Sequence, residues 1–138
     1  MIELTIAHLD EIFAHARAVS PSECCGMIGG MADGRAKNIY RLRNMATDPL
    51  VTYDAAPEEL FAAQRSMRLR DEQLLAIYHS HPRATEPVPS DTDIRLAYYP
   101  AAVYLIVGLG GPEPIMRAFR ISEKEHRWEA VEYQMVDE

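Results

Sequence analysis

Two histidines one residue apart, followed by a serine and an aspartate, are the residues of this chain best suited to chemistry. They are His79, His81, Ser90 and Asp93, in the stretch HSHPRATEPVPSDTD. Alternate side chains of a β-strand point to the same face, and the apolar run 74–78 suits a buried strand. We therefore expect the two imidazoles to leave the strand end side by side. With one carboxylate they supply the three protein ligands of a hydrolytic zinc site.

Each half of this pattern also has a simpler structural interpretation. Two histidines at the end of a strand are often exposed or hydrogen-bonded side chains that hold no metal. Ser90-x-x-Asp93 is typical of a capping box, in which the serine caps a helix and the aspartate lies at its third position. The two interpretations of Ser90 and Asp93 are compatible. A helix that begins beside the strand end would direct Asp93 toward the histidines, and its dipole would favour negative charge there.

Hydrolysis at such a site also requires a base, and Glu23 is the candidate. It directly precedes the apolar run Cys24-Cys25-Gly26-Met27-Ile28, so it enters the sheet where a solvated charge is not expected. A carboxylate within hydrogen-bond reach can take a proton from the attacking water and deliver it to the leaving group. The alternative is an exposed glutamate at the start of a strand.

Composition limits the class of protein. At 138 residues with 48% hydrophobic and 25% charged residues, we expect one globular domain over residues 1–138. A formal net charge of −7 argues against a nucleic-acid partner. The sequence contains no apolar run long enough to span a bilayer and no secretory signal, so we expect a cytoplasmic protein. Cys24 and Cys25 are adjacent, which disfavours a disulfide between them and indicates reduced, buried thiols.

Periodicity and turn residues predict a central mixed sheet with helices packed against it. A helix over 9–19 ends before Pro21, and a second helix begins near Pro57. A third, short helix begins at Ser90 and is ended by Pro100. The predicted strands are 23–31, 37–42, 51–53, 74–79, 102–109, 115–121 and 128–136.

Glu23 in PSECCG, the HSHP motif and Ser90-x-x-Asp93 together resemble the JAMM (MPN-plus) family of zinc metalloproteases, over most of the chain. The resemblance implies the JAMM α/β fold, a curved mixed sheet flanked by helices and akin to that of cytidine deaminases. It implies that His79, His81 and Asp93 bind one zinc ion per chain. It also implies that Glu23 is the general base and that Ser90 helps to hold the oxyanion.

One spacing departs from the family pattern. Eight residues, 82–89, separate His81 from Ser90, where the family usually has seven. The extra residue falls in a proline-rich loop that can bulge without moving its ends. Ser90 and Asp93 keep their mutual offset, so we expect an intact ligand set and an altered substrate-facing loop.

The resemblance is greatest to compact, stand-alone bacterial members that act on sulfur carriers, such as CysO-cysteine-like peptidases. It implies cleavage after the C-terminal Gly-Gly of a ubiquitin-like carrier of the ThiS/MoaD type, with release of cysteine or of a C-terminal extension. Residues 51–53 and the loop 82–89 are the candidate walls of the groove for that tail. Two alternatives remain: a non-catalytic MPN-type scaffold, and a zinc hydrolase that acts on an unrelated small substrate.

Overall fold

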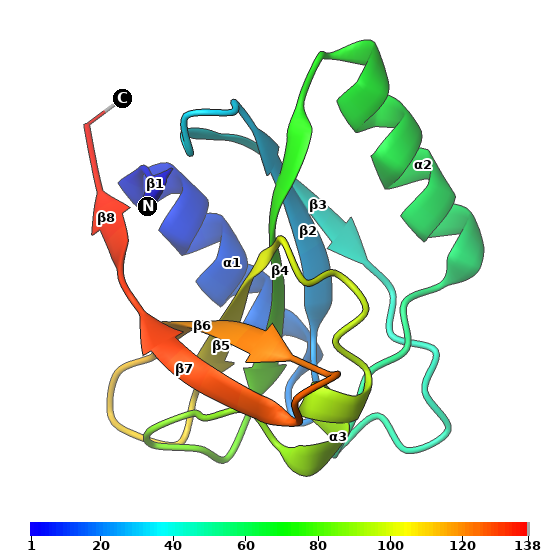
Figure 1. Ribbon diagram of the computed structural model, residues 1–138. Coiled ribbons are helices and arrows are strands. Elements are labelled where there is room, and N and C mark those ends of the chain that lie inside the picture. Colours follow the sequence, from blue (N-terminus) through cyan, green and yellow to red (C-terminus); the bar gives the residue numbers. More distant parts are fainter. Residues whose placement is uncertain (138) are drawn as a thin grey trace.

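A six-stranded mixed sheet forms the centre of the structure, a computed structural model that describes residues 1–137 (Figure 1). The strand order is β3-β2-β4-β5-β6-β7; β4 and β5 run parallel, and the other neighbouring pairs run antiparallel. The strands of this sheet are β2 (Cys25–Gly30), β3 (Ala36–Leu42), β4 (Gln73–His81), β5 (Val103–Gly108), β6 (Ile115–Ser122) and β7 (Arg127–Val131). The remaining elements are β1 (Ile2–Leu4), β8 (Tyr133–Met135), α1 (Ile6–Val19), α2 (Pro57–Leu69) and α3 (Asp91–Arg95). The predicted α/β class with a mixed central sheet is confirmed.

The two longer helices cover opposite faces of the sheet. Ile28 of β2 belongs to the same buried cluster as Ile12 of α1. Its neighbour Met27 belongs to a cluster with Met67 of α2. This division follows from the alternation of side chains along a strand, and Figure 1 shows α1 and α2 on either side of β2 and β4. Among residues 1–137, no helix has the length and apolar character needed to cross a membrane.

The same alternation separates the two cysteines. Cys24 lies in the cluster with α1 and Cys25 in the cluster with α2, and both are free, buried thiols. Burial raises the pKa of Cys24 to about 11 and that of Cys25 to about 12. Both therefore stay protonated at neutral pH, as the sequence indicated.

Several predicted boundaries are wrong. Helix α1 begins at Ile6 instead of residue 9, because Thr5 and His8 form a capping box ahead of the apolar stripe. Residues 51–53 form no strand; the N–H groups of Val51 and Thr52 donate to the carbonyl of Asp48 in a turn.

Two further differences lie in the second half of the chain. Helix α3 ends at Arg95, five residues before Pro100, so the proline does not terminate it. The predicted strand 128–136 is interrupted at Glu132. Its second part, β8, leaves the large sheet and pairs in parallel with β1, which the sequence did not predict.

A buried histidine joins α1 to the sheet. His15 Nδ1 lies 2.7 Å from the hydroxyl of Tyr78 on β4, and both side chains are buried. Tyr78 lies across Gly26, where a Cβ atom would come within 2.2 Å of the ring. Burial is the main cause that lowers the pKa of His15 to about 4, and the nearby Arg41 cation lowers it further. The imidazole is therefore neutral in the folded protein at neutral pH.

This pKa predicts part of the acid sensitivity of the fold. Because the pKa of His15 is about 4 when folded and 6.5 ordinarily, its stabilising contribution is complete above pH 6.5 and is lost as pH falls toward 4. We expect the residue to account for about 3 kcal/mol of the loss of unfolding free energy between pH 7 and pH 4. Urea denaturation at both pH values should show a correspondingly smaller loss in His15→Gln. An identical pH dependence in parent and variant would contradict the assignment.

Candidate metal centre

The end of β4 carries two imidazoles on one face. His79 and His81 point to the same side of the sheet, and Ser80 between them points to the other, as the strand alternation predicts. His79 is buried between the neighbouring strands, where it pairs with Cys25 of β2 and Ile106 of β5. The Nε2 atoms of the two histidines lie 3.2 Å apart.

The start of α3 brings the carboxylate of Asp93 to the same point. The predicted capping box is confirmed: Ser90 Oγ accepts the Asp93 N–H at 3.0 Å, and Asp93 Oδ2 accepts the Ser90 N–H at 2.9 Å. The same Oδ2 atom lies 3.1 Å from His79 Nε2 and 3.0 Å from His81 Nε2. The cap therefore fixes the carboxylate against both rings, and the longer loop 82–89 does not separate Asp93 from the histidines.

These three atoms have the spacing of ligands that share one small cation. Four ligands placed tetrahedrally at zinc-like distances of ~2.0–2.1 Å lie about 3.3 Å from one another. The observed separations of 3.0 to 3.2 Å are close to that value. Two neutral imidazoles cannot both direct an Nε2 proton at one oxygen without crowding, whereas two unprotonated Nε2 atoms and a carboxylate suit a divalent metal. The residues fit a zinc ion.

The charges around Asp93 are coupled. Burial alone would raise the pKa of Asp93, but His79, His81 and the Ser90 N–H together hold it well below the usual range. Burial alone would lower the pKa of His81, but the Asp93 carboxylate raises it overall. The carboxylate is therefore ionised and available as a ligand across the neutral range.

Glu23 is the fourth residue whose side chain reaches this point. It precedes β2, and one of its carboxylate oxygens lies within 4.8 Å of the ligand atoms of His79, His81 and Asp93. The side chain is 4% exposed, and its Oε1 atom finds no hydrogen-bond partner among residues 1–137. Burial, aided by the Asp93 charge and opposed by His81, raises the pKa of Glu23 to about 8. A carboxyl group with a pKa near neutrality can both accept and release a proton.

Tyr53, expected from the sequence as part of a substrate wall, also packs on a proposed metal ligand, which the sequence did not predict. It lies in the β3–α2 loop, residues 43–56, and its ring packs on that of His79 with centroids 4.7 Å apart and planes tilted by 32°. His79 Nδ1 is buried without a hydrogen-bond partner in the described chain. Ring packing therefore orients this imidazole in place of the hydrogen bond that the other ring nitrogen of a metal-binding histidine usually donates. A contact between residues 26 positions apart gives no local sequence signal.

A hollow of about 650 Å³ opens beside Tyr53. Aromatic and aliphatic side chains form most of its wall, and residues 46–48 and 52–55 of the β3–α2 loop contribute to it. Its lining includes Met27, Leu42, Thr52, Tyr53, Leu60, Ile77, Leu96, Tyr98, Tyr99 and Tyr104. Thr52 and Tyr53 belong to the expected substrate wall 51–53, whereas the loop 82–89 contributes no residue to this hollow.

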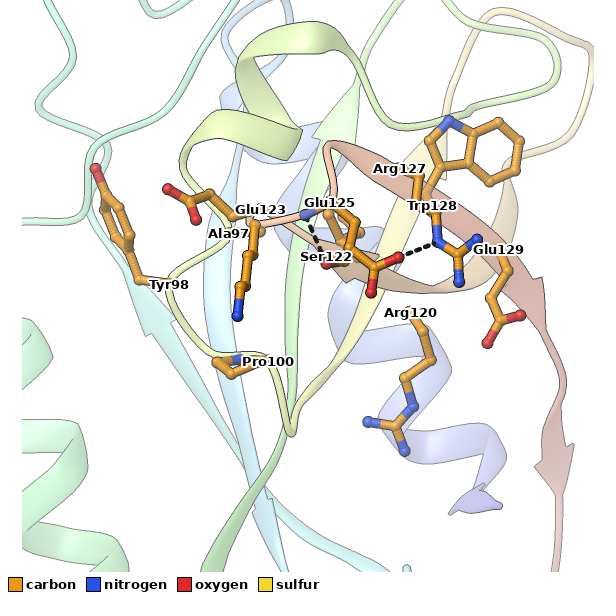
Figure 2. Close-up of a pocket in the computed structure, with 12 residues that line it drawn as sticks. Ala97, Tyr98, Pro100, Arg120, Ser122, Glu123, Glu125, Arg127, Trp128 and Glu129 are labelled. Atoms are coloured by element: carbon orange, nitrogen blue, oxygen red, sulfur yellow. Dashed lines mark hydrogen bonds and ion pairs between the residues drawn. The ribbon is translucent and has the colours of Figure 1, made fainter.

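A second hollow, of about 640 Å³, lies between the segment after α3 and the β6–β7 hairpin (Figure 2). Arg127 in its wall pairs with Glu125 at 3.0 Å, and Trp128 packs edge-on against Phe119. Its wall carries three basic and three acidic side chains, Arg120, Lys124, Arg127, Glu123, Glu125 and Glu129. None of the four residues of the metal group lines it. None of them lines the hollow beside Tyr53 either, but the Tyr53 ring packs on His79, which places that hollow next to the group.

Comparison with known proteins identifies the family. The family described as prokaryotic homologs of the JAB domain matches residues 5–122. The desampylase of Haloferax volcanii is 36% identical over 107 residues, which are 74% of this chain and 76% of that protein. The CysO-cysteine peptidase of Mycobacterium tuberculosis is 33% identical over 130 residues, 94% of this chain and 79% of that protein.

The fold agrees with this assignment. A JAB1/MPN domain protein from Archaeoglobus fulgidus superimposes with a TM-score of 0.66 over 99% of this chain and 98% of its own, at 16% identity. That likeness concerns the fold alone, whereas the sequence matches carry the family. Because the family matches in sequence and His79, His81, Asp93 and Glu23 are grouped where they could hold a metal ion, the chain belongs to the JAMM metalloprotease family of prokaryotic JAB-domain proteins.

Proposed function

We propose that residues 1–138 act as a single zinc-dependent peptidase domain that cleaves after the C-terminal Gly-Gly of a ubiquitin-like sulfur carrier. The observation that carries the proposal is the convergence of Glu23, His79, His81 and Asp93, whose ligand atoms lie within 4.8 Å of one another. Tyr53, which packs on His79, also lines an apolar, aromatic-rich hollow. Relatives of this chain include the CysO-cysteine peptidase and, at 34% identity, a probable TtuB-protein conjugate cleaving protease of Thermus thermophilus. The bond cleaved here joins the second glycine of the carrier to cysteine or to a C-terminal extension of the carrier.

His79, His81 and Asp93 would hold the metal through two Nε2 atoms and Oδ2. Bound zinc would polarise the scissile carbonyl and lower the pKa of water at the site. The protein contributes a buried, pre-oriented ligand set that needs no rearrangement. The capping box fixes Asp93, and the packing of Tyr53 fixes His79.

Glu23 moves the proton. Its carboxylate takes a proton from the attacking water and then delivers it to the nitrogen of the leaving amine. Burial keeps its pKa high enough for the second step, and a cation beside it favours the ionised form needed for the first. The reaction passes through no covalent enzyme intermediate, in keeping with the protonated, buried state of Cys24 and Cys25.

Ser90 is the proposed donor to the developing oxyanion. Its Oγ already accepts the Asp93 N–H, and a hydroxyl that accepts one hydrogen bond still has its own hydrogen to donate. Structural and catalytic roles of Ser90 are therefore compatible. Loss of one oxyanion donor typically lowers kcat about 10²- to 10³-fold.

A Gly-Gly tail suits a metal group whose His79, Asp93 and Glu23 side chains are buried. Glycine has no side chain, so its backbone can approach a confined centre that excludes larger residues. Thr52 and Tyr53 form one wall of the adjoining hollow, which leaves the apolar remainder of the wall for the side chains that precede the two glycines.

Metal analysis tests the ligand set. Purified parent protein should contain about one zinc per chain by mass spectrometry. The double variant His79→Ala, His81→Ala should lose it, because only one strong ligand remains. His8→Ala is the matched control, since His8 belongs to the cap of α1, and should keep the metal. Stoichiometric zinc in the double variant would refute the assignment.

Cleavage of a carrier tests the reaction and the role of Glu23. The substrate is a ubiquitin-like carrier that ends in Gly-Gly joined to cysteine, incubated with and without chelator and followed by intact mass. Glu23→Gln should retain zinc but lose about 10²- to 10⁴-fold in kcat, because an amide cannot take up the proton. Glu129→Gln on the exposed strand β7 should keep the parent's rate.

The same assay separates the proposal from the alternatives. A scaffold, or a zinc hydrolase of an unrelated small substrate, would leave the carrier intact even with zinc bound. Parent-like turnover by Glu23→Gln would remove this residue from the mechanism.

A further inference from the structure

Asn44, directly after β3, uses every hydrogen-bonding position of its side-chain amide. Its Nδ2 group donates to the carbonyl oxygens of Glu23 and Thr52, both at 3.0 Å. Its Oδ1 atom accepts the N–H groups of Ala46 at 2.9 Å and Asp54 at 3.0 Å. An amide offers two donors and two acceptor lone pairs, so this side chain is saturated by backbone partners.

We infer that Asn44 is a positioning residue that holds the backbone of Glu23 and the β3–α2 loop in one fixed arrangement. The inference rests on the proposed role of Glu23 as the base. It assigns a function to a residue that touches neither the ligand atoms nor the hollow beside them.

The backbone around Glu23 shows why such a residue is needed. Glu23 lies two residues before β2, so the strand ladder does not hold it. Its N–H donates instead to Pro49 O in the β3–α2 loop at 2.7 Å, and its carbonyl accepts from Asn44. The next N–H, of Cys24, donates to the hydroxyl of Ser80 on β4 at 2.8 Å. Two of these three bonds come from the loop, so its conformation sets the position of Glu23.

The loop also reaches the proposed metal ligands. Tyr53 lies between Thr52 and Asp54, whose backbone groups bind Asn44, and the Tyr53 ring packs on His79. One amide therefore links the base, the aromatic wall and a ligand ring. A displacement of about 1 Å at a catalytic group can cost about 100-fold in rate, so the loss of this link should be visible in kcat.

Two substitutions separate the role of Nδ2, which donates to Glu23 and Thr52, from the role of Oδ1, which accepts from the loop. Asn44→Asp keeps an oxygen for the N–H groups of Ala46 and Asp54 but loses the donor to Glu23 and Thr52. Asn44→Ala removes both the donated and the accepted hydrogen bonds. Asn38→Ala is the matched control, because Asn38 lies on β3 and its amide donates to the distant Glu72 carboxylate.

With the carrier substrate, Asn44→Asp should lower kcat about 100-fold and leave KM close to the parent's, because the loop stays closed while the base is displaced. Asn44→Ala should lower kcat as much and also raise KM, because the wall of the hollow is released. Zinc content should remain at the parent's level in both, since no hydrogen bond of Asn44 reaches a proposed ligand. Parent-like kcat in Asn44→Asp, or an equal loss in Asn38→Ala, would overturn the inference.

Amide hydrogen exchange gives a readout that does not depend on the substrate. Asn44→Asp should speed exchange at the N–H groups of Glu23 and Cys24 by about tenfold and leave those of Ala46 and Asp54 protected. Asn44→Ala should speed exchange at all four of these N–H groups. If the parent fails to cleave the carrier, the proposed function fails, but these rates still decide the positioning role: unchanged exchange at Glu23 and Cys24 in Asn44→Asp refutes it.

Discussion

The meeting of two imidazole nitrogens and one carboxylate oxygen within 3.2 Å constrains the rest of the structure. His79 and Asp93 are buried, and ionisable groups taken from water need partners that compensate for lost hydration. A divalent cation compensates all three groups at once. The sheet and helix around them must therefore be rigid enough to hold these atoms together at the edge of the core.

Two simple elements satisfy this constraint. The extended end of β4 sets the direction of both imidazoles, because alternate residues share a face. The capping box of α3 sets the carboxylate, because the same Asp93 Oδ2 atom that faces the rings also accepts the Ser90 N–H. Helix α3 has only five residues, and its principal contribution is this cap. The parts of the site that do not lie on regular elements, Glu23 and Tyr53, are held by loop hydrogen bonds and ring packing.

Local patterns predicted much of this arrangement. The His79–His81 spacing and the Ser90-x-x-Asp93 box both lie within fifteen residues of sequence. The structure contains the predicted strand end and the predicted capping box. The start of α1 was missed because its cap lies outside the apolar stripe. The pairing of β1 with β8, and the packing of Tyr53 on His79, join distant parts of the chain. Such contacts depend on tertiary structure and leave no local periodicity. The segment 51–53, Val-Thr-Tyr, has the β-branched and aromatic composition of a strand, yet the N–H groups of Val51 and Thr52 bind the carbonyl of Asp48 in a turn.

The central claim is that one metal ion lies among three named atoms, and diffraction at the zinc absorption edge tests it most directly. The account predicts a single anomalous peak about 2.0–2.1 Å from His79 Nε2, His81 Nε2 and an Asp93 carboxylate oxygen. Glu23 should lie outside bonding distance of that peak. A zinc-loaded crystal with no peak between these atoms, or with zinc bound through Glu23 in place of Asp93, would contradict the account.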